Sequence, residues 1–97
     1  MPKGYWIARV SVHDADRYRD YVAAATPAYQ EYGARFLVRG GEIGASEGEM
    51  RPRNVVIEFP TYEAALACYN SPVYARARAI RQEISDGEIV VVEGHQD

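Results

Sequence analysis

The sequence predicts an α+β fold whose elements follow the order strand, helix, strand, strand, helix, strand. Two observations support this prediction. Short segments with alternating apolar residues lie near both ends of the chain and as a pair in its middle, which is typical of strands. Two longer segments between them carry apolar residues at helical spacing. With 97 residues, the chain has the length of one domain, and we expect residues 1–97 to form it.

The first strand is expected over residues 5–12, and the first helix follows it. One face of the strand is apolar and consists of Trp6, Ala8, Val10 and Val12. Asp14 is expected to cap the helix, and Gly33 is expected to end it. Thr26-Pro27 has the form of a new helix start, so we expect a kink or a restart there. The helix carries an aromatic stripe of Tyr18, Tyr21, Tyr29 and Tyr32.

The middle of the chain predicts two strands, over residues 35–39 and 54–59. Gly40-Gly41 is expected to break or bulge the first of them. Residues 42–48 are expected to resume it as a short strand before a turn. By alternation, the side chains that face the helices are Phe36, Val38, Val55, Ile57 and Phe59.

The second helical segment is divided at Asn70-Ser71-Pro72. Thr61 is expected to cap its first part, and Ser71 with Pro72 to start its second part. The apolar seam of the second part consists of Val73, Ala77, Ile80 and Ile84, and its flanks, expected to be solvated, carry Arg76, Arg78 and Arg81. Gly87 is expected to end this helix, and residues 88–93 to form the last strand. A four-stranded antiparallel sheet with helices on one face is the ferredoxin-like βαββαβ architecture.

Composition and charge exclude several classes of protein. The net charge is −3 with acidic and basic residues interspersed, which argues against nucleic-acid binding because that requires a basic stripe. The chain has neither the roughly 20 apolar residues in a row that span a bilayer nor the apolar amino-terminal run of a signal peptide. The one cysteine, Cys68, cannot form an intrachain disulfide. We therefore expect a cytoplasmic protein that has no membrane partner.

The face of the sheet that points away from the helices is also partly apolar, and this predicts a dimer. Its apolar side chains are expected to be Tyr5, Ile7, Leu37 and Val56, with the charged Arg9, Arg39 and Glu58 among them. An exposed apolar patch of this extent is a liability on a monomer. Two sheets packed face to face would bury it. We therefore predict a homodimer through the open sheet face.

Several segments resemble the domain-of-unknown-function 1330 family. They are Gly4-Tyr5-Trp6-Ile7, Arg39-Gly40-Gly41, Glu47-Gly48, Val56-Ile57-Glu58-Phe59-Pro60, Tyr69-Asn70-Ser71-Pro72 with Tyr74, and Val91-Val92-Glu93-Gly94. The resemblance covers nearly the whole chain and implies a protomer of the dimeric α+β barrel superfamily. It also implies a small-molecule cavity between sheet and helices, but no established reaction. Cofactor-independent monooxygenases and muconolactone isomerase-like enzymes share the fold, which does not transfer their function.

The candidate site residues fall into a polar and an aromatic set. Arg39 and Glu58 are charged residues in predicted strands, where each needs a partner if the open face is buried. Glu58 would be a catalytic acid or base if burial raises its pKa, and Arg39 with Gly40 would bind an anionic group. The aromatic walls of the cavity would come from Trp6, Tyr69 and Tyr74.

Two functions remain open on this basis. The first is a small-molecule-binding protein or an enzyme that needs no cofactor, with its site in the aromatic cavity. The second is a non-catalytic dimeric module, in which Arg39 and Glu58 form a structural ion pair and the tyrosines fill the core. His13 and Asp16 offer two metal ligands at most, so no metal site is expected. Cys68 shows no base beside it and is expected to be a core residue.

Overall fold

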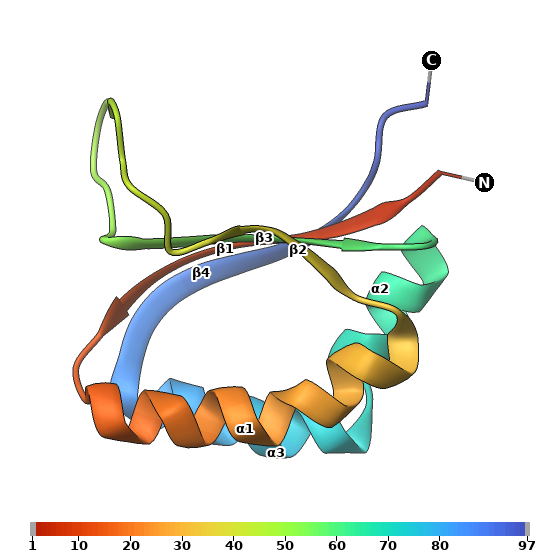
Figure 1. Ribbon diagram of the computed structural model, residues 1–97, viewed down its shortest axis with the longest axis horizontal. Helices are drawn as coiled ribbons and strands as arrows, with labels where there is room; N and C mark the ends of the chain where they lie inside the picture. Colours follow the sequence, from red (N-terminus) through yellow and green to blue (C-terminus); the bar gives the residue numbers. More distant parts are fainter. Residues whose placement is uncertain (1, 97) are drawn as a thin grey trace.

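The computed structural model describes residues 2–96, which form four strands and three helices. In chain order they are β1 (Gly4–Val12), α1 (Ala15–Tyr32), β2 (Arg35–Arg39), β3 (Arg53–Phe59), α2 (Tyr62–Tyr69), α3 (Pro72–Ile84) and β4 (Ser85–Glu93). The strands pair antiparallel in the order β2-β3-β1-β4, and the helices cover one face of the sheet (Figure 1). This is the predicted ferredoxin-like α+β fold. None of these helices is long and apolar enough to cross a membrane.

The helices begin at the residues that the sequence predicts as caps. The side chains of Asp14, Thr61 and Ser71 each accept a hydrogen bond from the backbone N–H three residues further on. Pro72 occupies the first turn of α3, where its missing N–H costs nothing. Gly33 ends α1 in the left-handed conformation, with φ of 74°. These local signals fix the helix starts and the end of α1.

The restart predicted at Thr26-Pro27 is wrong, because α1 continues through Pro27 as one helix. The hydroxyl of Thr26 donates to the backbone carbonyl of Val22 at 2.7 Å instead of capping a new helix. Two other residues in this part of α1, Ala25 and Ala28, are completely or almost completely buried. Packing on both sides of Pro27 therefore maintains the helix across it.

Two other predicted boundaries are also wrong. Residues 41–50 are exposed and form a loop, not a short strand, and the loop rises on the side of the sheet opposite the helices (Figure 1). The helix α3 ends at Ile84 and passes directly into β4, so Gly87 lies inside the strand. A Cβ atom at Gly87 would collide with the backbone carbonyl of Arg9. The glycine therefore serves the close approach of β4 to β1 and not the end of a helix.

A bulge in β2 reverses the predicted direction of its last two side chains. Phe36 pairs with Ile57 but Arg39 pairs with Val55, so three steps along β2 match two steps along β3. One extra residue turns every following side chain to the other face. Arg39 therefore faces the helices, and Val38, 41% exposed, lies on the open face. Regular alternation predicts the opposite arrangement, with Val38 toward the helices and Arg39 on the open face.

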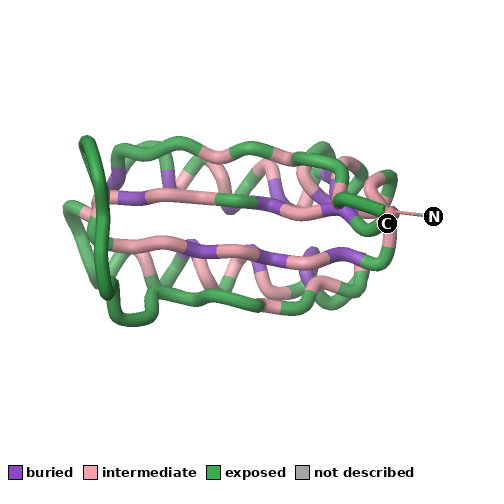
Figure 2. Tube along the Cα trace, turned by 90° about the horizontal axis from the view of Figure 1, so that it is seen from above, coloured by how far each residue is buried: buried purple, intermediate pink, exposed green. Residues whose placement is uncertain are grey.

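The core lies between the sheet and the helices, around Trp6. Figure 2 shows that the buried positions concentrate on the two central strands and on the helices beneath them. Trp6 is 1% exposed, and its indole N–H donates to the backbone carbonyl of Ala65 at 2.9 Å. Its ring meets the ring of Tyr74 edge-on, with the centroids 4.7 Å apart. This aromatic cluster connects β1 to α2 and α3.

Candidate functional site

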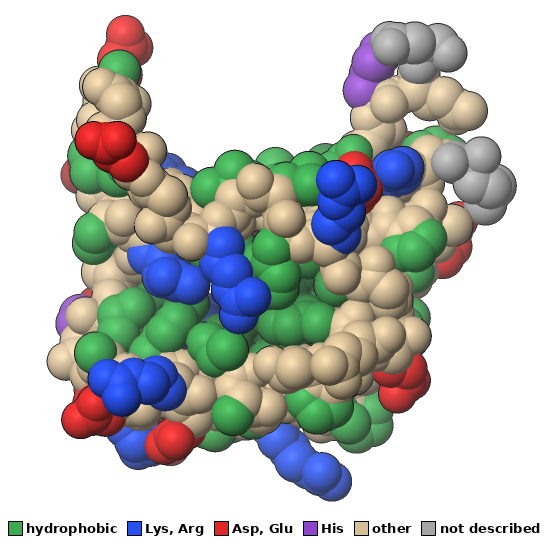
Figure 3. Space-filling model, viewed as in Figure 1, with side chains coloured by type: hydrophobic (Ala, Val, Ile, Leu, Met, Phe, Trp, Pro, Cys, Tyr) green, Lys and Arg blue, Asp and Glu red, His purple; other side chains and the backbone are tan. Residues whose placement is uncertain are grey.

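A cleft with aromatic walls opens between the sheet and the helices. It leaves about 510 Å³ free of atoms, part of it open to solvent, although the centre of a water molecule reaches only about 30 Å³. Figure 3 shows hydrophobic side chains inside the opening and basic side chains around it. The aromatic lining residues are Trp6, Tyr18, Tyr21, Tyr29 and Phe36. The cleft is therefore narrow and mostly apolar.

Three arginines line this cleft, whereas its lining in the described part of the chain holds no carboxylate and no imidazole. Arg39 projects from β2 and lies 4.0 Å from the centroid of the Phe36 ring. Arg53 begins β3, and its Nε donates to the hydroxyl of Tyr18 at 3.0 Å. Arg81 comes from α3 and is only 9% exposed. The cleft therefore has a positive potential although the chain is acidic overall.

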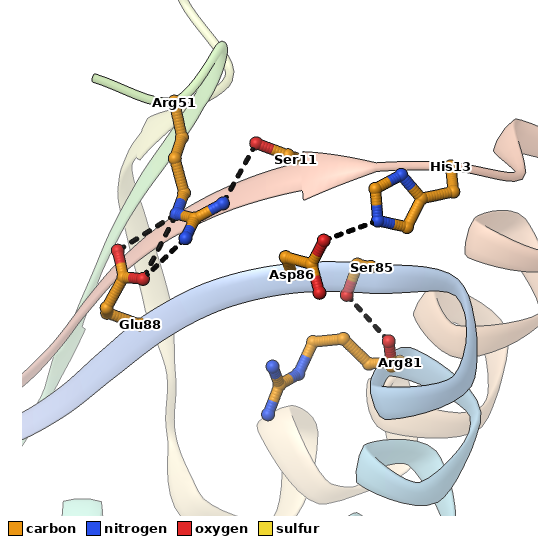
Figure 4. Close-up of polar contacts among 7 residues, drawn as sticks. All are labelled: Ser11, His13, Arg51, Arg81, Ser85, Asp86 and Glu88. Atoms are coloured by element: carbon orange, nitrogen blue, oxygen red, sulfur yellow. Dashed lines mark hydrogen bonds and ion pairs between the residues drawn. The ribbon is translucent and has the colours of Figure 1, made fainter. Parts of the chain in front are cut away.

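Arg81 extends from α3 into the space beneath β4 (Figure 4). Its backbone carbonyl accepts a hydrogen bond from the hydroxyl of Ser85 at 2.6 Å. Its side-chain Nε is buried and has no hydrogen-bond partner among the described residues. The guanidinium lies near Tyr74 and 6.0 Å from the centroid of the Tyr21 ring. The guanidinium shares a side-chain hydrogen bond with Tyr74, but among residues 2–96 no carboxylate forms an ion pair with it. A buried charge without an opposite charge beside it loses its hydration with little compensation.

The hydroxyl groups of three buried tyrosines form a chain beside Arg81. The hydroxyl of Tyr21 lies 2.9 Å from that of Tyr74 and 3.2 Å from that of Tyr29. Burial raises the pKa of all three phenols above the usual value, so they remain neutral at physiological pH. Two hydrogen bonds use two of the three O–H protons, so one O–H remains available to another acceptor.

The structure brings some of the predicted site residues together. Trp6 and Arg39 both line the cleft, whereas Tyr69 and Tyr74 pack around the Trp6 ring, with centroids 5.7 Å and 4.7 Å from it. Gly40 follows Arg39 with φ of 69°, and its N–H donates to a backbone carbonyl of β3 at 2.9 Å. That N–H is therefore already used and does not point at an anion.

Glu58 lies on the opposite face of the sheet from Arg39. One carboxylate oxygen is 3.2 Å from Nζ of Lys3, and the other accepts a hydrogen bond from the hydroxyl of Tyr5 at 3.1 Å. The hydrogen bond from Lys3 is the main cause that holds the pKa of Glu58 below its usual value. Burial opposes it, and the hydrogen bond from Tyr5 adds to the lowering. The ion pair of Glu58 with Arg39 is therefore wrong for this chain, and the condition of a raised pKa for Glu58 is not met. A catalytic role for Glu58 stays a prediction.

The family of the chain follows from its sequence. The model of the family described as Domain of unknown function (DUF1330) matches residues 3–95. This chain belongs to the DUF1330 family. No curated protein matches its sequence.

Solved structures share the fold of this DUF1330 chain at low sequence identity. A protein of unknown function from Rhodopseudomonas palustris is 16% identical with a TM-score of 0.75, over 99% of this chain and 85% of that one. A dimeric ferredoxin-like protein of unknown function from Jannaschia sp. CCS1 is 19% identical with a TM-score of 0.71, over 97% and 99%. SnoaB, a cofactor-independent oxygenase from Streptomyces nogalater, is 14% identical with a TM-score of 0.67, over 100% and 97%. These likenesses establish the fold.

Sequence reasoning missed Arg53 and Arg81 as residues of the DUF1330 cleft. Arg81 was expected on a solvated flank of its helix, but it is buried with Tyr74, Ala77 and Ile84. These four positions follow at i, i+3, i+7 and i+10, which is the spacing of one helix face. That spacing was the signal that could have identified Arg81.

The other reactive side chains lie outside the lining of the cleft. Burial raises the pKa of the Cys68 thiol to about 12, so it is not a thiolate at neutral pH. His13 Nε2 lies 2.7 Å from a carboxylate oxygen of Asp86 on the surface, as Figure 4 shows. Within residues 2–96, no three His, Cys, Asp or Glu side chains are grouped to hold a metal ion.

Proposed function

We propose that this protein binds a small molecule in the cleft between the sheet and the helices. The observation that carries the proposal is an apolar, aromatic cleft that opens to solvent in the middle of a small domain. Unfilled apolar space lowers stability, so a cleft retained there is typical of a ligand site. The binding residues would be Trp6 and Arg39 in its lining, with Tyr69 and Tyr74 supporting the wall.

If the ligand is also transformed, the cleft favours chemistry that develops negative charge on it. Apart from the indole of Trp6, the polar side-chain groups in the lining of the cleft are phenols and guanidinium cations, which can donate hydrogen bonds. Donors fixed in a low-dielectric site stabilise a developing anion. SnoaB, which has the same fold, is described as an oxygenase, and this likeness supports catalysis only by analogy.

We also propose that two copies associate through the open faces of their sheets. The exposed apolar side chains on this face include Ile7, Val38, Val90 and Val92, which are between 39% and 50% exposed. The 41–50 loop and the carboxyl-terminal segment rise at opposite ends of the same face (Figure 1). The Jannaschia structure is described as dimeric, which supports a dimer here.

The alternative is a non-catalytic dimeric module, and the narrowness of the cleft favours it. Tyr74 is fully buried in the aromatic cluster, and water reaches little of the unfilled space. In this alternative the cleft is a packing defect and binds nothing. A binding measurement on a variant with a filled cleft separates the two functions.

Val22 offers such a variant because it lines the cleft from α1 and is only half-buried. We expect wild-type protein to bind at least one flat apolar compound in a saturation-transfer NMR screen that contains indole, benzoate, 2-naphthoate and 2-naphthamide. Val22→Phe places a ring in the cleft and is expected to weaken that binding at least tenfold. Ala23→Phe, at the exposed neighbouring position, should leave it unchanged. The absence of binding by any compound, or equal binding by Val22→Phe, would contradict the proposal.

A further inference from the structure

Arg81 restricts the chemical class of the ligand, because its charge has no counterion among residues 2–96. It is 9% exposed. Its guanidinium shares a hydrogen bond with the neutral side chain of Tyr74, but its buried Nε has no hydrogen-bond partner within the part of the chain that the structure describes. No carboxylate of residues 2–96 forms an ion pair with it. Buried charges are normally paired, because an unpaired one loses its hydration without compensation. A counterion from outside the chain would satisfy this guanidinium.

The surroundings of Arg81 favour one shape of counterion. The guanidinium is a planar fork, and two of its parallel N–H groups match the two oxygens of a carboxylate. The hydroxyl chain of Tyr21, Tyr29 and Tyr74 lies beside it with one O–H available. Together they offer donors from two elements, α1 and α3, to a single acidic group.

The rest of the cleft determines what carries that acidic group. The remaining lining is mainly aromatic and aliphatic, with Phe36 and Ile57 on the sheet side. Aromatic walls pack well against a flat apolar group. A strongly hydrated inorganic anion would lose its hydration there, and the apolar walls would offer few hydrogen bonds to replace it. Arg39 and Arg53 lie nearer the solvent and would attract an anion to the cleft.

We propose that the cleft binds an organic carboxylate with a flat apolar body, and that Arg81 holds the carboxylate. The acid group enters first and reaches Arg81, and the apolar body remains among the aromatic rings behind it. This inference rests on the proposed function and adds to it the class of ligand. It also makes Arg81 a binding residue, and not a residue that serves only to support the fold.

The test compares 2-naphthoate with its neutral counterpart 2-naphthamide by isothermal titration calorimetry, with inorganic phosphate as a further arm. We expect wild-type protein to bind 2-naphthoate at least tenfold more tightly than 2-naphthamide, and to bind phosphate more weakly than either. Arg81→Met should lower the affinity for 2-naphthoate at least tenfold and change the affinity for 2-naphthamide less than threefold. Arg81→Lys, which keeps the charge but not the planar fork, should give an intermediate affinity. The control Arg76→Gln, at an exposed position of the same helix, should behave as wild type.

Thermal melting of the ligand-free variants separates ligand binding from a structural role. Replacing an unpaired buried charge with an apolar side chain of similar length is expected to maintain or raise the melting temperature. A lower melting temperature of Arg81→Met together with unchanged 2-naphthoate affinity would overturn the inference. Equal affinity of wild type for 2-naphthoate and 2-naphthamide would overturn the ligand class but leave the proposed function intact. Failure of both compounds to bind would count against both proposals.

Discussion

Replacing Trp6 with alanine is expected to lower the free energy of unfolding by about 3–5 kcal/mol, the usual cost of deleting a buried large aromatic side chain. Trp6 is 1% exposed, and its ring contacts those of Phe59, Tyr29, Tyr69 and Tyr74. Small domains are stable by only about 5–15 kcal/mol, so this variant would be close to unfolding. The measurement is urea denaturation followed by far-ultraviolet circular dichroism, which does not depend on tryptophan fluorescence.

The control for this experiment is Trp6→Phe. This variant keeps a ring in the cluster and loses the hydrogen bond of the indole N–H to the backbone carbonyl of Ala65. Its expected cost is about 1–2 kcal/mol, the range for an unmade buried hydrogen bond with a small loss of packing. A loss below about 1 kcal/mol for Trp6→Ala would contradict the packed cluster around this residue.

Val90→Asp is expected to convert the proposed dimer into a monomer. Val90 is 50% exposed on the open sheet face and pairs with Ile7 across β1 and β4. In a symmetric dimer each copy would bring one carboxylate into the buried interface, and unpaired buried charges cost several kcal/mol each. Size-exclusion chromatography with light scattering at micromolar protein should show the change in mass.

The matched control keeps the shape of the side chain at this position. Val90→Thr has nearly the same volume and no charge, so we expect it to remain a dimer. Both variants should fold, because the side chain of Val90 is 50% exposed in the protomer. A wild-type protein with a monomer mass, or a Val90→Asp variant with a dimer mass, would contradict association through this face.

Local signals in the sequence predicted most of the fold. Asp14, Thr61 and Ser71 were expected as caps and all three accept the capping hydrogen bond, because capping depends on only a few neighbouring residues. Pro27 shows the limit of such signals. Its effect on α1 depends on the tertiary packing of the helix, which overrides the local preference of proline for a first turn.

The direction of the β2 side chains could not be predicted in the same way. Alternation assumes a regular ladder, whereas the bulge between Phe36 and Val38 depends on how β2 pairs with β3. For this reason Arg39 was assigned to the open face and lies instead at the cleft. Arg39 lines the cleft because the bulge turns its side chain toward the helices.

The candidate site was only partly predictable because its most unusual residue contradicts a simple rule. A charged side chain is usually expected to be exposed, so Arg81 was assigned to a solvated flank in spite of its position on the buried helix face. Within the protein it has a hydrogen bond to Tyr74 and a contact with the Tyr21 ring, and an anionic ligand in the cleft would supply the missing counterion. Residues that violate a local rule without compensation inside the protein are often functional.

The occupancy of the cleft by a small molecule is tested most directly by intermolecular nuclear Overhauser effects at saturating 2-naphthoate. We expect cross-peaks from the naphthyl protons to the ring protons of Phe36 and Tyr21 and to the methyl groups of Val22, which all line the cleft. Cross-peaks only to the open sheet face, for example to Ile7 and Val90, or no intermolecular cross-peaks at all, would contradict binding in the cleft.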